Sequence, residues 1–132
     1  MNLGLITESF SQDKRDWLQG AHGTDIAPSV TLDVTKFTAN THFPDGYIKS
    51  GIPLGKITTG GKYGPYDNAA ADGREVCVGF LYTGVEVVTR RGATLTSAVG
   101  SMLVHCAVKE SKLPVAVDAA GKTDLGARVI FV

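Results

Sequence analysis

Residues 30–38, VTLDVTKFT, place Val30, Leu32 and Val34 at every second position with polar residues between them. Alternation with a period of two predicts a β-strand with one buried side and one solvent-facing side. The Pro44-Asp45-Gly46 segment that follows predicts a tight turn, because Pro fixes φ and Gly accepts a positive φ. No second strand lies at hairpin distance, so we expect this strand to pair with something outside its own domain.

From Tyr47 onward, short apolar runs alternate with turn signals. Gly60-Gly61 suits a two-residue hairpin loop, and Asp72-Gly73 marks another turn. Gly79, inside an apolar run, suggests a bulge or a close backbone approach. Asp118 is placed to cap a short helix that ends at Gly126. The expected strands cover residues 30–38, 47–51, 52–59, 62–66, 76–82, 85–88, 99–109 and 127–132.

This pattern predicts a mainly β protein: a small barrel or sandwich-like domain with one or two short helices and an extended N-terminal arm. We expect the arm to cover residues 1–46 and the β-rich domain to cover residues 47–132. Ser9 and Gln12 have the spacing of a capping box, which predicts a short helix ending at Gly20. Trp17, the only tryptophan, either folds back on the domain or anchors on a partner, and the sequence favours neither.

Composition narrows the possible functions. Thirteen basic residues balance thirteen acidic ones, so the net charge is zero, which argues against a general nucleic-acid binder. No run of apolar residues is long enough to span a membrane, and the N-terminus lacks the pattern of a secretory signal. We therefore expect a protein made and kept in a cytosol. Cys77 and Cys106 sit in apolar runs and are expected to be reduced, buried thiols.

Candidate catalytic and ligand motifs fail on spacing. Gly55 and Gly60 are separated as in a phosphate-binding loop, but Gly61 stands where its Lys should be, and the Lys that comes one position later, Lys62, is followed by Tyr63 instead of a Ser or Thr. The three histidines, His22, His42 and His105, have no partner at metal-ligand spacing. We accordingly expect no enzymatic activity and no bound cofactor, metal or nucleotide.

The stretch YIKSGIPLGKITTGGKYGPYDNAAADGREVCVGFL, residues 47–81, resembles the signature segment of the bacteriophage head decoration proteins, the family of the phage lambda capsid-stabilising protein. Its matching parts are Pro53, Gly55, Ile57 and Thr58, then Lys62, Tyr63, Pro65 and Tyr66, the Asp72-Gly73 turn, and residues 78–81. The ending KLPVAVDAAGKTDLGARVIFV is similar to the family's Leu-Pro, Asp-capped helix and final strand.

The resemblance implies a structural virion protein on the outer surface of the phage head, made in the host cytoplasm. Such a protein forms a homotrimer at local three-fold axes of the expanded icosahedral head. There it would clamp the major capsid protein through its N-terminal arm against the pressure of packaged DNA, with no direct contact to nucleic acid or membrane. The arm residues expected to bind the capsid are Trp17, Leu18, Val30, Leu32, Val34 and Phe37.

The sequence leaves two other functions open. A β-rich ligand- or carbohydrate-binding module on a virion or cell surface would need an exposed aromatic platform, for which Tyr63, Tyr66 and Tyr82 are the candidates. A small hydrolase is the third, although no set of nucleophile, base and orienting group is visible in the sequence.

Overall fold

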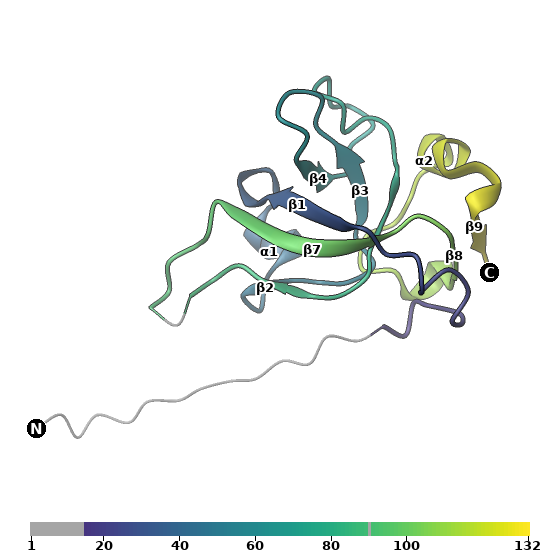
Figure 1. Ribbon diagram of the computed structural model, residues 1–132, viewed down its shortest axis with the longest axis horizontal. Helices are drawn as coiled ribbons and strands as arrows, with labels where there is room; N and C mark the ends of the chain where they lie inside the picture. The colour runs from purple at the N-terminus through teal and green to yellow at the C-terminus, as the bar shows by residue number, and fades with distance from the viewer. Residues whose placement is uncertain (1–14, 90) are drawn as a thin grey trace, which may run out of the picture.

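The computed structural model describes residues 15–89 and 91–132, and its centre is a closed five-stranded β-barrel (Figure 1). Around the barrel the strand order is β1-β4-β3-β5-β7, and β7 closes the ring by pairing with β1. Only the β1–β4 pair is parallel; the other four pairs are antiparallel. The barrel strands are β1 Ser29–Asp33, β3 Pro53–Lys56, β4 Tyr63–Pro65, β5 Gly79–Leu81 and β7 Ser97–Leu103.

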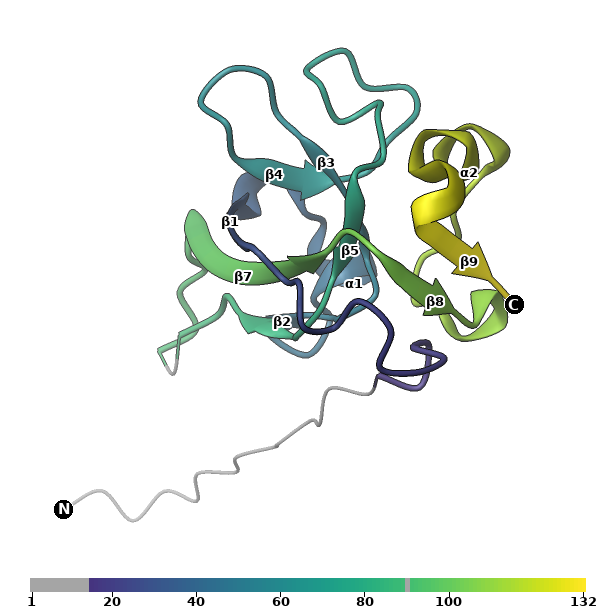
Figure 2. The same cartoon turned by 45° about the vertical axis from the view of Figure 1, so that its right-hand side comes forward.

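Smaller elements complete the described fold. Strand β2 pairs with β6 in antiparallel fashion, and β8 pairs with β9 in parallel. Helix α2 lies beside β8 and β9 on one side of the barrel (Figure 2). The strands are β2 Tyr47–Ile48, β6 Val85–Glu86, β8 Cys106–Val108 and β9 Val129–Phe131. The helices are α1 Ala39–His42 and α2 Ala119–Leu125, with 3-10 turns at Val34–Lys36, Glu110–Lys112 and Gly126–Arg128.

The prediction of a small, mainly β domain is confirmed, and the local sequence signals explain the β3–β4 turn and both ends of α2. Gly60 and Gly61 have φ angles of 89° and 74° and join β3 to β4, with Ile57 N–H donating to the Lys62 carbonyl at 2.7 Å. Asp118 caps α2 by accepting a hydrogen bond from Gly121 N–H at 2.8 Å. Gly126 follows as the C-cap, as expected.

Two groups of buried side chains hold the fold together. The first fills the barrel, and the second lies between β5, β7, β8, β9 and α2. The first contains Val30, Leu32, Val34, Phe37, Phe43, Ile48, Ile52, Leu54, Leu81, Val87 and Met102. The second contains Trp17, Cys77, Phe80, Leu103, Cys106, Val108, Val117, Leu125 and Val129.

The structure corrects the expectation of an unpaired strand near residue 30. All five residues of β1 are paired with β7, from Ser29 opposite Ser101 to Asp33 opposite Ser97, and Leu32 also pairs with Tyr63 of β4. A boundary between residues 46 and 47 would remove one wall of the barrel. Residues 29–46 therefore belong to the barrel domain. No local signal in the sequence indicates this pairing, because Thr31 at the centre of β1 and its partner Val99 are 68 positions apart.

Several element bounds also differ from expectation. The strand expected over residues 76–82 is reduced to β5, and the one expected over 99–109 is interrupted between β7 and β8. A Cβ at Gly79 would lie 2.4 Å from the Leu103 carbonyl oxygen, which confirms a close backbone approach there. The helix expected from Ser9 falls partly on residues 1–14, outside the described residues, and residues 15–20 form a turn and an isolated bridge instead. No helix in the described ranges is long and apolar enough to cross a membrane.

Candidate interaction surface

Four of the residues expected to contact a capsid are in the barrel core. Val30, Leu32, Val34 and Phe37 are all buried in the first core group. Their side chains are not available to a partner in this fold, because exposing them would open the barrel. The expectation that the apolar side of this strand faces a capsid subunit is therefore corrected, while capsid binding by other residues stays a prediction.

The segment that carries Trp17 and Leu18 also folds onto the domain. Trp17 is 1% exposed, its indole N–H donates to the Ser50 hydroxyl at 3.0 Å, and its ring lies 6.1 Å from that of Phe80. Leu18 is half-buried and bridges Val108 of β8. Of the two possibilities left open for Trp17, the structure supports packing against its own domain.

The outward side of the β1–β7 pair forms a surface of short, mostly uncharged side chains. We call it the ribbon face, and the two strands lie side by side at the front of Figure 1. Val99 stands at its centre opposite Thr31 and is 68% exposed. Among the residues of this face only Asp33 is charged, and its carboxylate accepts hydrogen bonds from the backbone N–H and hydroxyl of Thr35. One further charge lies beside the face, where the Lys62 ammonium donates to the Ser97 hydroxyl at 2.7 Å. The ribbon face consists of Ser29, Thr31, Asp33, Ser97, Val99 and Ser101.

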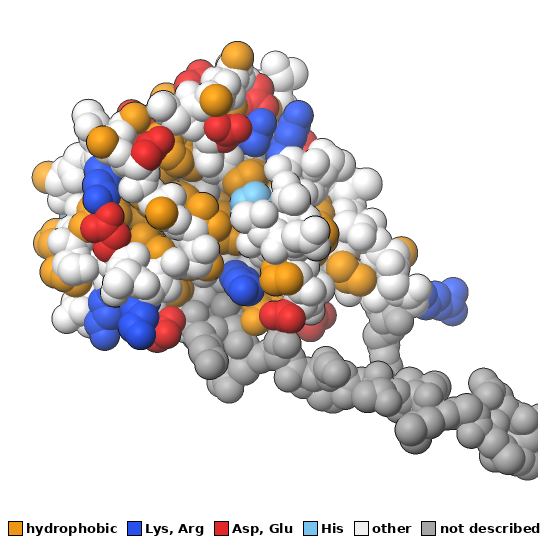
Figure 3. Space-filling model, turned by 180° about the vertical axis from the view of Figure 1, so that it is seen from behind, with side chains coloured by type: hydrophobic (Ala, Val, Ile, Leu, Met, Phe, Trp, Pro, Cys, Tyr) orange, Lys and Arg blue, Asp and Glu red, His pale blue; other side chains and the backbone are white. Residues whose placement is uncertain are grey.

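Exposed apolar side chains also lie near both ends of this strand pair. Ile26 precedes β1 and is 58% exposed, and Leu95 precedes β7 and is 41% exposed. Hydrogen bonds next to each residue hold it close to the ribbon face. Near Ile26, the Pro28 carbonyl accepts from Met102 N–H, and next to Leu95, the Thr96 carbonyl accepts from Val34 N–H. An apolar centre within a weakly charged surface is the composition found in the cores of protein interfaces. Viewed from behind, by contrast, acidic and basic side chains intermingle with apolar ones (Figure 3).

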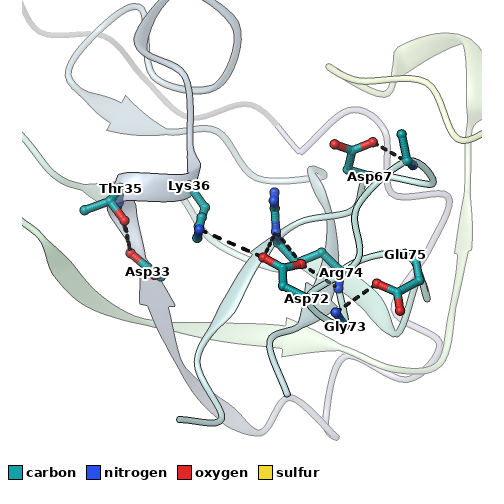
Figure 4. Close-up of polar contacts among 9 residues, drawn as sticks. Asp33, Thr35, Lys36, Asp67, Asp72, Gly73, Arg74 and Glu75 are labelled. Atoms are coloured by element: carbon teal, nitrogen blue, oxygen red, sulfur yellow. Dashed lines mark hydrogen bonds and ion pairs between the residues drawn. The ribbon is translucent and has the colours of Figure 1, made fainter. Parts of the chain in front are cut away.

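The glycine-rich stretch that first suggested a phosphate loop has a structural role. Arg74 lies across the β3–β4 hairpin, and a Cβ at Gly55 or Gly64 would come within 2.6 Å or 2.7 Å of its atoms. The Arg74 side chain donates to both carboxylate oxygens of Asp72, at 3.1 and 3.0 Å, and Lys36 lies 4.0 Å from the same carboxylate (Figure 4). The loop over residues 67–75 is thus held against the barrel by the packing of Arg74 on Gly55 and Gly64 and by the ion pair between Lys36 and Asp72.

Electrostatics at this loop favour the ionised carboxylate. Partial desolvation raises the pKa of Asp72, but hydrogen bonds from the side chain and backbone of Arg74 outweigh it, so the pKa lies below its ordinary value. Glu75 adds a contact within the loop by accepting from Gly73 N–H at 2.8 Å. The residues of the loop thus satisfy one another rather than presenting an open anion site.

The three tyrosines proposed as a carbohydrate platform are each half-buried and engaged in different places. Tyr63 packs against the first core group, whereas Tyr66 and Tyr82 pack against the second. The Tyr66 hydroxyl donates to Asp118 at 2.7 Å; burial and this bond raise the pKa of Tyr66, and the same bond lowers that of Asp118. The Arg15 guanidinium lies 4.9 Å from the Tyr82 ring centroid. The structure therefore does not gather them into one platform.

Sequence reasoning missed one pairing of chemically active side chains. His22 and His105 are 83 positions apart, yet His22 Nε2 lies 2.6 Å from His105 Nδ1. Within the described ranges no group of three or more His, Cys, Asp or Glu side chains could hold a metal. Cys77 and Cys106 are free and buried, and burial raises their pKa values to about 12 and about 11, which makes both thiols poor nucleophiles at neutral pH.

Compared with known proteins, the chain matches no protein-family model and no curated sequence.

Proposed function

We propose that the protein is a bacteriophage head decoration protein, a non-enzymatic structural component of the virion. It binds the major capsid protein on the outer surface of the expanded head and stabilises the shell against packaged DNA. The observation that carries this proposal is the ribbon face, with Val99 exposed at the centre of a weakly charged strand pair. The resemblance of residues 47–82 and 113–132 to the decoration proteins supplies the identity of the partner.

The ribbon face suits a rigid contact. Its backbone is fixed by the barrel, so binding does not have to order a free strand, which would cost roughly 1–2 kcal/mol per residue in conformational entropy. Strand β1 keeps the contacting role that the resemblance implies, but it uses Ser29 and Thr31 instead of the buried Val30 and Leu32. A clamp by the N-terminal segment remains part of the proposal for residues 1–14, which lie outside the described ranges.

The proposed homotrimer follows from the same resemblance. A three-fold ring requires head-to-tail contacts between two different surfaces of each protomer. The ribbon face is taken up by the capsid contact, so the ring needs surfaces elsewhere; β9 and the residue after it offer one, because Ile130 and Val132 are 54% and 63% exposed. Three ribbon faces held in one trimer would then bind a head far more tightly than one, because the second and third contacts form at high effective concentration.

A head-binding assay tests the proposal. Tag-free protein is mixed with expanded, DNA-free heads built from the major capsid protein of the phage that encodes it, and bound protein is measured after sedimentation. We compare the wild type with Val99→Glu on the ribbon face and with Val76→Glu, an exposed valine outside it. Circular dichroism verifies that both variants are folded.

We expect the wild type and Val76→Glu to saturate the heads, and Val99→Glu to bind at least tenfold more weakly because a charge is desolvated at the contact. Failure of the wild type to bind would reject the decoration function. Equal binding by Val99→Glu would leave the function standing but move the contact away from the ribbon face.

A further inference from the structure

The His22–His105 pair joins two parts of the chain at the protein surface. His22 lies in the turn that follows the Leu18–Val108 bridge, and His105 lies between β7 and β8. Both side chains are exposed, with ring centroids 4.6 Å apart and an interplanar angle of 62°. One ring nitrogen from each imidazole therefore faces the other, at 2.6 Å.

The backbone positions this pair, so it does not depend on two flexible side chains meeting. A Cβ at Gly23 would lie 1.7 Å from the His105 carbonyl oxygen, and Gly23 has a φ of 76°, so the turn lies directly against the β7–β8 connection. Hydrogen bonds fix the segment on both sides of His22. Gln19 N–H donates to the Ala107 carbonyl at 2.9 Å, and Met102 N–H donates to the Pro28 carbonyl at 3.0 Å.

We propose that His22 and His105 form a surface site for a divalent transition-metal ion of the Ni²⁺, Cu²⁺ or Zn²⁺ type. Imidazole nitrogen is a preferred ligand of these ions. His22 would bind through Nε2 and His105 through Nδ1, the two atoms that already face each other. Because the part of the chain that the structure describes offers no third ligand group there, water completes the coordination shell.

Metal binding requires only a small local change. Two nitrogens at about 2.0–2.1 Å from one ion, at angles between about 90° and 109°, are roughly 2.9–3.3 Å apart. The rings would thus separate by a few tenths of an ångström from their 2.6 Å contact and would turn so that both nitrogen lone pairs point at the ion. The proton of the hydrogen bond moves to the outer nitrogen of its own ring, so both imidazoles bind as neutral ligands and no redox step is involved.

The bound ion would act as a cross-link between the segment of residues 17–28 and the β7–β8 connection. That segment carries Trp17, which is one of the buried residues of the second core group. Because the two ligands converge in the folded chain, the ion binds the native state preferentially and must raise its stability. The site is independent of the proposed capsid role, since it uses neither β1 nor β9.

Isothermal titration of the tag-free protein with NiCl₂ and with ZnCl₂ tests the site, together with thermal unfolding with and without chelator. The variants are His22→Gln, His105→Gln and the matched control His42→Gln, which removes the third histidine. Histidine-ring NMR identifies the nitrogen whose signal changes on addition of Zn²⁺.

We expect one ion per chain, a melting temperature that rises with metal and falls with chelator, and shifts at His22 Nε2 and His105 Nδ1. Loss of either imidazole should weaken binding by about 100-fold, because the second ligand acts at high effective concentration. His42→Gln should bind like the wild type. The site is disproved if the wild type takes up no ion at millimolar metal, or if binding survives in both His22→Gln and His105→Gln.

Discussion

Replacing Leu32 by Ala tests whether β1 is a core strand of the barrel. The Leu32 side chain is fully buried, and β1 is paired on both sides, with β4 and with β7. Leu→Ala changes in cores cost about 2–5 kcal/mol, because a cavity adds to the lost transfer free energy. A barrel wall fixed on both sides can collapse little into the cavity, so we expect about 3–4 kcal/mol for Leu32→Ala.

Unfolding in guanidinium, followed by circular dichroism and tryptophan fluorescence, measures this cost. Trp17 is the only tryptophan and is buried, so its emission reports on the folded domain. The matched control is Thr31→Ala, which changes the exposed neighbour on the same strand and should alter stability by no more than about 0.5 kcal/mol. We expect the melting temperature of Leu32→Ala to fall by roughly 10 °C or more. Similar small effects in the two variants would show that β1 is not a core strand.

Three further predictions concern particular contacts. Trp17→Ala should cost about 3–5 kcal/mol if its segment is part of the domain, and a loss below about 1 kcal/mol would contradict that. In denaturant unfolding, Gly79→Ala should lower the free energy of unfolding by about 1–3 kcal/mol, because its Cβ meets the Leu103 carbonyl. Gly20→Ala has open space around its Cβ and should leave the stability nearly unchanged, so equal effects of the two changes would contradict the close approach at Gly79. Burial lowers the pKa of His42 from 6.5 and outweighs a backbone hydrogen bond that raises it, so the unfolded chain binds more protons and the free energy of unfolding falls as the pH drops through 6.5. Urea unfolding across this range should show that the free energy of unfolding depends less steeply on pH in His42→Gln, and an unchanged pH dependence would refute the assignment.

Local signals carried most of the correct sequence predictions. The Gly60-Gly61 turn needs two positive φ angles, and the Asp118 cap and Gly126 stop each use one residue type with a specific backbone role. Such features depend on a few neighbouring residues, so the sequence states them directly. The alternation over residues 30–35 likewise predicted correctly which side chains of β1 are buried.

Long-range pairing was not predictable in the same way. Alternation shows that β1 has a buried side, but it does not show whether that side faces its own barrel or a partner. The closure of β1 on β7 and the meeting of His22 with His105 depend on the path of the whole chain. The candidate surface therefore lies on the other side of the predicted strand, at Thr31 in place of Leu32 and Val34, and extends to Val99 on the neighbouring strand β7.

Cryo-electron microscopy of expanded heads saturated with the protein tests the central claim most directly. We predict three-fold symmetric density at the local three-fold positions of the shell, into which three barrels fit with Val99 and Thr31 of each ribbon face against the major capsid protein. Density confined to two-fold or five-fold positions, or barrels whose ribbon faces point to solvent, would contradict the account.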